Sequence, residues 1–194
     1  NKRTDRLAVQ TVLCLILFAA GQSGPAHAQR FDDPDERLAT NFKQLKAGTD
    51  AAVQGDCEGA LSILSAAANE DVFMRHSKAI RANVFRNLAV CAYRLQQHER
   101  SVPYFEAAVD LGDENGSELL QDLVWLGKHL QRLDISVKAV VRLAEDYPGE
   151  LGRMNIRILS ELHGLLNGRD VGGELKFAYL RALHDNDFTP EHPF

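Results

Sequence analysis

Hydrophobic residues recur every three to four positions along the chain from about residue 37 onward. This spacing is typical of amphipathic helices, and no stretch alternates between apolar and polar residues as a half-buried strand does. Breaks in the pattern contain glycine beside polar or turn-forming residues, at 54–56, 111–116, 147–152 and 167–170. The pattern predicts an all-α protein of about eight helices arranged in antiparallel pairs.

Three aspartates stand directly before an apolar-periodic run: Asp56, Asp134 and Asp170. An aspartate at such a position can accept hydrogen bonds from the free amide groups of the first helical turn. We therefore expect each of them to cap the start of a helix.

Small residues occupy recurring positions within the predicted helices. The motif Leu88-Ala89-x2-Ala92, followed by Ser101 and Phe105, recurs 38 residues later as Leu126-Gly127-x2-Leu130, followed by Ala139 and Leu143. It recurs 41 residues earlier as Ala47-Gly48-x2-Ala51, followed by Ala60 and Leu64. In every copy the small residue of the second part lies nine positions after the end of the first part, at 51 to 60, 92 to 101 and 130 to 139.

Two helices cross closely only where their side chains are small. The pattern therefore predicts that Gly48, Ala89 and Gly127 in the first helix of each pair face Ala60, Ser101 and Ala139 in the second. A fourth pair, between about Ile156 and Leu183, keeps the same rhythm and has Phe177 in the large position.

These motifs resemble the tetratricopeptide repeat, whose pattern is W-x2-L-G-x2-Y, then A-x3-F, then P. The copy from Phe85 to Ala108 matches best, and the resemblance covers residues 38–183 as three to four hairpins. It implies a short right-handed α-solenoid in which stacked antiparallel hairpins share one core. It also implies that the first helices line a concave face that binds a peptide or protein.

The N-terminus has the features of an export signal. Three basic residues precede an apolar run of 14 residues, Leu7 to Ala20, and a small-residue site ending at Ala28. The run is shorter than the ~20 residues that span a bilayer, so we expect no stable membrane span after cleavage. The predicted organisation is a signal peptide (1–28), a polar leader (29–37), the repeat domain (38–183) and a polar tail (184–194), with both ends compatible with a longer parent chain.

Removing residues 1–28 changes the formal net charge from −5 to −7. This acidic balance argues against a dedicated nucleic-acid binder. The signal peptide and the repeat together predict a periplasmic or secreted protein of a bacterial cell envelope. In such an oxidising compartment, Cys57 and Cys91 are expected to form a disulfide between adjacent helices. The alternative is that they are two buried thiols.

Motifs that would indicate catalysis or a cofactor are not found in the sequence. It contains no G-x-S-x-G, no phosphate-binding loop and no H-E-x-x-H. The histidines and carboxylates of residues 184–192 could meet around a metal, but a solvated tail is the simpler interpretation. We therefore expect a protein that is not an enzyme and binds no metal or cofactor.

The candidate binding site is the exposed face of two predicted first helices. Helical spacing groups Asn83, Arg86, Val90, Tyr93 and Arg94 on one of them, and Gln121, Lys128, Gln131 and Arg132 on the next. Basic and aromatic side chains suit a ligand with carboxylates, so the predicted partner is an acidic peptide or protein surface.

Three alternatives stay open at this point. The first is that the charges of this face are paired with nearby acids and bind nothing. The second is an accessory module of a larger envelope enzyme. The third is a structural role through self-association.

Overall fold

The computed structural model describes residues 33–147, 149–154 and 156–186. These residues form eight α-helices and two short 3-10 helices, and they contain no strand, which confirms the all-α prediction. None of these helices is both long enough and apolar enough to cross a bilayer. The predicted signal peptide (1–28) and residues 187–194 of the predicted tail lie outside the described residues. The chain divides into two compact units, 1–36 and 37–194, and the packing below is that of the second.

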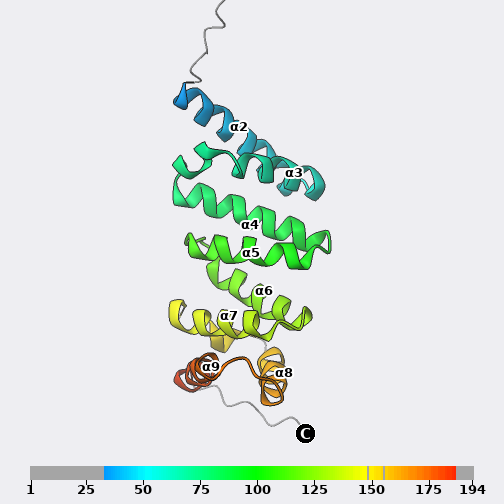
Figure 1. The fold of residues 1–194 in the computed structure, drawn as a ribbon, viewed down its shortest axis with the longest axis vertical. Helices are drawn as coiled ribbons and strands as arrows, with labels where there is room; N and C mark the ends of the chain where they lie inside the picture. The colour runs from blue at the N-terminus through cyan, green and yellow to red at the C-terminus, as the bar shows by residue number, and fades with distance from the viewer. Residues whose placement is uncertain (1–32, 148, 155, 187–194) are drawn as a thin grey trace, which may run out of the picture. The chain divides into compact units, whose positions relative to one another are not determined.

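The helices follow one another along the chain with short connections. Their bounds are α2 Pro34–Val53, α3 Cys57–Ala68, η1 Asp71–Arg75, α4 Lys78–Arg94, α5 His98–Asp110, α6 Gly116–His129, α7 Leu133–Asp146, η2 Leu151–Arg153, α8 Ile156–Asn167 and α9 Gly173–Asp185. The closest packing pairs α4 with α5 and α6 with α7, while α3 packs on α4 and α5 on α6 (Figure 1). Helices α3 to α7 therefore pack mainly against their neighbours in sequence.

The turns inside the first three pairs have one geometry. Gly55, Gln96 and Gln131 each stand two residues before the second helix and have left-handed backbones, with φ of 86°, 62° and 59°. In each turn the next residue donates a backbone hydrogen bond five residues back, to the carbonyl of Ala51, Ala92 or Gly127. This is the Schellman-type ending of a helix. The same ending closes α5, where Gly112 has φ of 76° and the Asp113 amide donates to the Ala108 carbonyl.

This shared turn corrects the predicted register of the third copy. Gln131 corresponds to Gln96 and Gly127 to Ala92, so the third copy lies 35 residues after the second, not 38. A shift of three residues is close to one helical turn of 3.6, so it leaves the apolar face nearly unchanged. For this reason periodicity alone selected the wrong register.

The small residues allow close helix crossings, although with other partners than predicted. A Cβ added at Gly127 would lie 2.5 Å from Ser136 Oγ and 2.9 Å from the Arg132 carbonyl oxygen, so Gly127 approaches Ser136 and not Ala139. A Cβ added at Gly48 would lie 2.6 Å from Leu64 atoms, four residues beyond the predicted Ala60.

Of the three predicted helix caps, one is confirmed. Asp56 accepts a hydrogen bond from the Gly59 amide at the start of α3. Asp134 lies inside the first turn of α7, which begins at Leu133, so the prediction for Asp134 was wrong. The carboxylate of Asp170 accepts from the amide of Gly172, the residue directly before α9, and thus orders the turn instead of capping the helix.

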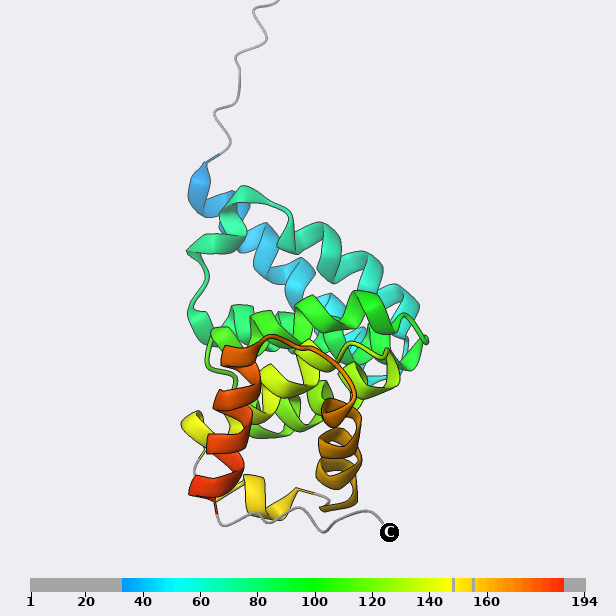
Figure 2. The same ribbon diagram turned by 60° about the horizontal axis from the view of Figure 1, so that its bottom comes forward.

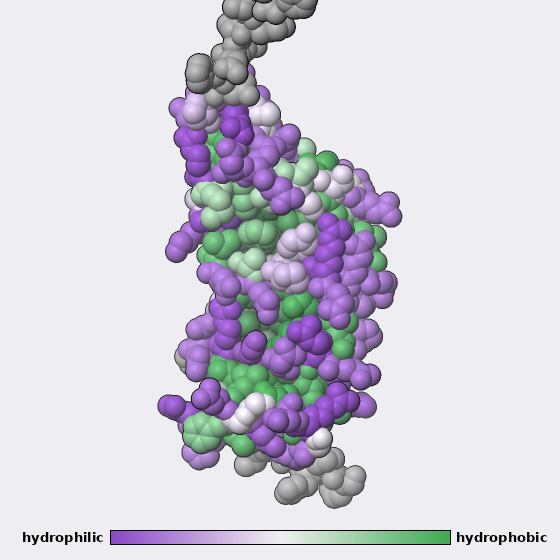
Figure 3. Space-filling view, in the orientation of Figure 1, coloured by the Kyte–Doolittle hydropathy of each residue, from purple (hydrophilic) through white to green (hydrophobic). Residues whose placement is uncertain are grey.

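The last pair, α8 and α9, departs from the pattern of the others. Of these two helices, α9 makes the larger contact with α7, whereas α8 touches α7 only slightly. Figure 1 shows α8 and α9 nearly end-on while α4 to α7 run across the picture, and Figure 2 shows the two along their length. Tyr179 is fully buried in this part, but Phe177 is 70% exposed, so the prediction that Phe177 fills a large core position was wrong. Apolar side chains come to the surface near α7 and α9, framed by hydrophilic ones (Figure 3).

Candidate functional site

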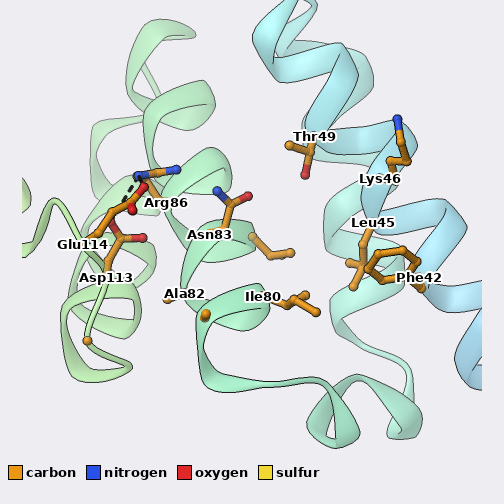
Figure 4. A pocket seen from close by; sticks show the side chains of 13 residues that line it. Phe42, Leu45, Lys46, Thr49, Ile80, Ala82, Asn83, Arg86, Asp113 and Glu114 are labelled. Atoms are coloured by element: carbon orange, nitrogen blue, oxygen red, sulfur yellow. Dashed lines mark hydrogen bonds and ion pairs between the residues drawn. The ribbon is translucent and has the colours of Figure 1, made fainter.

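Helices α2 and α4 and the loop between α5 and α6 surround a cavity of about 470 Å³. Its size falls in the range of ligand-binding pockets, which is ~300–1,000 Å³. We call it the α2–α4 cavity (Figure 4). It is lined by Phe42, Leu45, Lys46, Thr49, Ala79, Ile80, Ala82, Asn83, Val84, Arg86, Gly112, Asp113 and Glu114.

Helical spacing places the cavity-lining side chains of α2 on one face of that helix. In α2, Phe42, Leu45 and Thr49 follow each other at three and four residues, so they lie along one face. Helix α4 is started by Ser77, whose hydroxyl oxygen accepts from the Ile80 amide at 3.3 Å. This cap fixes where α4 begins and therefore which of its residues face α2.

The apolar part of the cavity includes a large exposed side chain. Phe42 is 48% exposed although it is aromatic. Its ring packs on His76, with the ring centroids 6.1 Å apart, and His76 is buried and hydrogen-bonded to Asn41 at 2.8 Å. Burial lowers the pKa of His76, so the ring that supports Phe42 is neutral at pH 7. Phe42 thus packs on a neutral ring and leaves about half of its own surface open to a ligand.

Polar groups at the cavity can bind a peptide backbone. The Asn87 side-chain amide donates to the Asn83 Oδ1 at 2.9 Å, which orients the Asn83 amide. The Asn83 Nδ2 group has no hydrogen-bond acceptor among the described residues. In Figure 4, Asn83 lies between Arg86 on one side and Thr49 on the other. The side chains of Asn83 and Thr49 can therefore form hydrogen bonds with a backbone carbonyl or amide of a bound peptide.

One end of the cavity is closed by an ion pair. Arg86 contacts the Asp113 carboxylate at 3.3 Å and the Glu114 carboxylate at 3.5 Å. Asp113 is buried and also accepts from the Asn115 amide at 2.9 Å, whereas the Glu114 side chain is 83% exposed. The Arg86 side chain is only 22% exposed, so the group that a ligand meets first at this end is the Glu114 carboxylate.

The seven residues predicted to bind a partner do not form one site. Asn83 and Arg86 line the cavity, and the other five, Tyr93, Arg94, Gln121, Lys128 and Arg132, do not. Lys128 is paired with Glu161 of α8, and hydrogen bonds from Lys128 and Arg157 lower the pKa of Glu161. The cation of Lys128 is thus engaged within the protein.

Arg132 is not on the face that the sequence predicted. Helix α6 ends at His129, and Arg132 lies in the following turn, where it pairs with Asp134 at 3.2 Å and approaches Glu99 at 4.0 Å. Gln131 lies in the same turn with a left-handed backbone, so it is also absent from the helix face. The prediction extended α6 too far because it placed the third copy three residues late.

Tyr93, at the end of α4, packs within an aromatic cluster. Its ring lies 5.8 Å from that of Trp125 and 5.2 Å from that of His98, and Trp125 stacks on His129 at 5.0 Å. Trp125 in α6 therefore contacts the end of α4. Arg94 is exposed and has no ion-pair partner in the described part of the chain.

The sequence prediction did not include several cavity residues, although the spacing between copies indicated them. Positions 41 residues before Asn83, Arg86 and Val90 lie in α2. These positions hold Phe42, Leu45 and Thr49, and all three line the cavity. With the corrected offset of 35, the counterparts in α6 are Glu118, Gln121 and Trp125. Projecting the candidate face onto the first copy would have found Phe42.

The predicted disulfide is not formed in the structure. Cys57 and Cys91 are free thiols, and both are buried. The pKa of Cys91 is raised to about 12, mainly by burial and also by a hydrogen bond with Cys57, so its thiol keeps the proton. The structure thus has the two buried thiols that the sequence left as the alternative.

Among the described residues, no group of three or more histidine, cysteine, aspartate or glutamate side chains is placed to hold a metal ion. Comparison of the chain with protein-family models, curated proteins and solved structures found no match.

Proposed function

We propose that this chain is a non-catalytic protein-interaction module that binds an extended peptide segment in the α2–α4 cavity. Its scaffold is a tetratricopeptide-like solenoid of helical hairpins. The protein acts as an adaptor in a bacterial cell envelope, after export to the periplasm or beyond.

The observation that carries this proposal is the composition of the cavity. A supported but half-exposed Phe42 faces Ile80 across an apolar space, next to an Asn83 amide whose Nδ2 has no acceptor in the described part of the chain. An apolar side chain of a peptide can fill such a space, and the amide can hold the neighbouring backbone. This combination suits a peptide better than a flat protein surface.

The repeated turn geometry supports the repeat assignment. The three turns recur after 41 and 35 residues, and the second interval is near the 34-residue period of the tetratricopeptide repeat. Single hairpins of this kind cannot bury their apolar faces alone, so neighbouring pairs must pack on one another. The packing of α3 on α4 and of α5 on α6 is of this kind.

The proposed export has a direct test. Expression of the full chain in a bacterial host, followed by N-terminal sequencing, should give a product that begins Gln29-Arg30-Phe31 in the periplasmic fraction. A product that keeps Leu7–Ala20 in the cytoplasmic fraction would contradict export and leave the binding proposal standing.

Peptide selection tests the binding proposal. Peptides are selected from a random displayed library on the purified full chain, and their affinities are measured for the wild type and for Phe42→Ser. A buried aromatic side chain covers roughly 150–250 Å², of which about half is available at Phe42, so its loss should cost roughly 2 kcal/mol at ~25 cal/mol per Å². The expected loss of affinity is about thirtyfold.

A matched control is Phe177→Ser, which removes the same side chain from an exposed position on α9. Affinity for the selected peptides should be unchanged in this variant. If both variants bind equally well while both remain folded, the α2–α4 cavity is not the binding site and the proposal is wrong.

A further inference from the structure

Carboxylates follow one another where the α2–α4 cavity adjoins α6. We call Asp113, Glu114, Glu118 and Asp122 the acidic edge: the first two line the cavity, and the other two lie in the first two turns of α6. Glu118 is also the counterpart in α6 of Asn83. The edge therefore continues the candidate binding face from one repeat to the next.

The charge of this edge is only partly compensated. Arg86 pairs with Asp113 and Glu114, but Glu118 and Asp122 have no ion-pair partner among the described residues. The pKa of Asp122 is raised, first because surrounding atoms remove part of its hydration and second because of the negative charge of Glu118 one turn away. The carboxylates thus repel one another and would be stabilised by an added cation.

The cations that were expected to attract an acidic ligand are mostly engaged elsewhere. Lys128 pairs with Glu161, and Arg132 with Asp134. Lys46, on the α2 side of the cavity, pairs with Asp50 at 2.7 Å. Arg94 is the exception, but it stands eight residues beyond Arg86 in the same helix, which is roughly 12 Å along its axis.

We propose that the peptide bound in the α2–α4 cavity is basic: it carries a lysine or arginine next to the apolar side chain that contacts Phe42. This inference rests on the proposed function and reverses the acidic ligand that the sequence predicted. The apolar side chain lies between Phe42 and Ile80, and the cation lies at Glu114 and Glu118.

Three synthetic peptides of equal length test this directly. All carry the apolar residue found by selection, flanked on one side by a Lys-Arg pair, by two serines or by two glutamates. Their affinities for the purified full chain are measured by fluorescence anisotropy at low and high salt. The Lys-Arg peptide should bind about tenfold more tightly than the serine peptide at low salt, and this advantage should shrink at high salt.

Charge reversal locates the effect on the protein. Glu114→Lys or Glu118→Lys should weaken the Lys-Arg peptide about tenfold and leave the serine peptide nearly unchanged. Glu114 is 83% exposed, so the substitution should not disturb folding. The control is Glu145→Lys, an equal change of charge at an exposed position of α7 that does not line the cavity.

The outcomes separate this inference from the proposed function. If the serine and Lys-Arg peptides bind equally, and Phe42→Ser weakens both, the cavity binds peptides without the proposed charge preference. If the glutamate peptide binds best, the acidic ligand predicted from the sequence is restored. If none of the three binds, the proposed function fails, and this inference fails with it.

Discussion

Replacing Gly127 by alanine tests the helix crossing on which the fold depends. The added Cβ would lie 2.5 Å from Ser136 Oγ, 2.7 Å from Ser136 N and 2.9 Å from the Arg132 carbonyl oxygen. Two of these atoms belong to the backbone and cannot rotate away. Helices α6 and α7 must therefore separate to admit a single methyl group.

The expected loss of stability follows from two opposing terms. Alanine is better than glycine in a helix interior by about 1 kcal/mol. Overpacking of a close contact typically costs ~1–3 kcal/mol, and we take about 3 because two of the contacted atoms are in the backbone. The net destabilisation is about 2 kcal/mol, or a fall in Tm of roughly 4–8 °C for a chain of this size.

Gly164→Ala is the matched control. Gly164 also lies inside a helix, α8, but apart from its chain neighbours and the adjacent backbone of its own helix, no atom lies within 4 Å of an added Cβ. The control should gain the helix-propensity term of about 1 kcal/mol and raise Tm by roughly 2–4 °C. Thermal melts followed by circular dichroism compare the two. If Gly127→Ala is stabilised as much as Gly164→Ala, the two helices do not approach as closely as described.

Three further predictions concern buried and charged groups. Because the pKa of Asp122 in the folded protein is raised above 3.8, the stability of the fold decreases as the pH rises from 3.8 through that folded-state pKa. Asp122→Asn should therefore raise Tm at neutral pH but not below pH 3.8. An equal gain in Tm at every pH would contradict this. Asn41→Ala removes the hydrogen-bond partner of two buried groups, the His76 ring and the Ala67 carbonyl. It should lower the free energy of unfolding, measured by denaturant titration, by roughly 2–4 kcal/mol. A loss under about 0.5 kcal/mol would be inconsistent with these two hydrogen bonds. Cys57 and Cys91 should react with a thiol reagent only after unfolding, whereas a chain that shows no thiol at these two positions in denaturant contains the disulfide instead.

The helical content was predictable because it depends on local periodicity. Apolar residues at intervals of three and four identify helices, and glycine-containing breaks mark most of their ends. The position of the turn between α6 and α7 was not predictable in this way. Gly127 matches Ala89 in an offset of 38 and Ala92 in an offset of 35, and both choices keep the apolar residues buried. Only the turn at Gln131 distinguishes them.

The candidate site was predictable in part. Asn83 and Arg86 were found because they share a face of one helix, which the sequence defines. The pairing of Lys128 with Glu161 was missed because the two residues are 33 positions apart and meet only through the packing of different helices. Phe42 was missed because an aromatic residue in a helix usually indicates core, and its 48% exposure is a property of the assembled fold.

A titration observed by methyl NMR tests the central claim most directly. The full chain, labelled at isoleucine, leucine and valine methyl groups, is titrated with a peptide obtained by selection. The account predicts saturable shifts of Leu45, Ile80 and Val84, which line the cavity, and unchanged signals of Leu165 and Leu180, which are exposed on α8 and α9. Shifts confined to Leu165 and Leu180, with the cavity signals unchanged, would contradict the account and place the binding surface at the last helix pair.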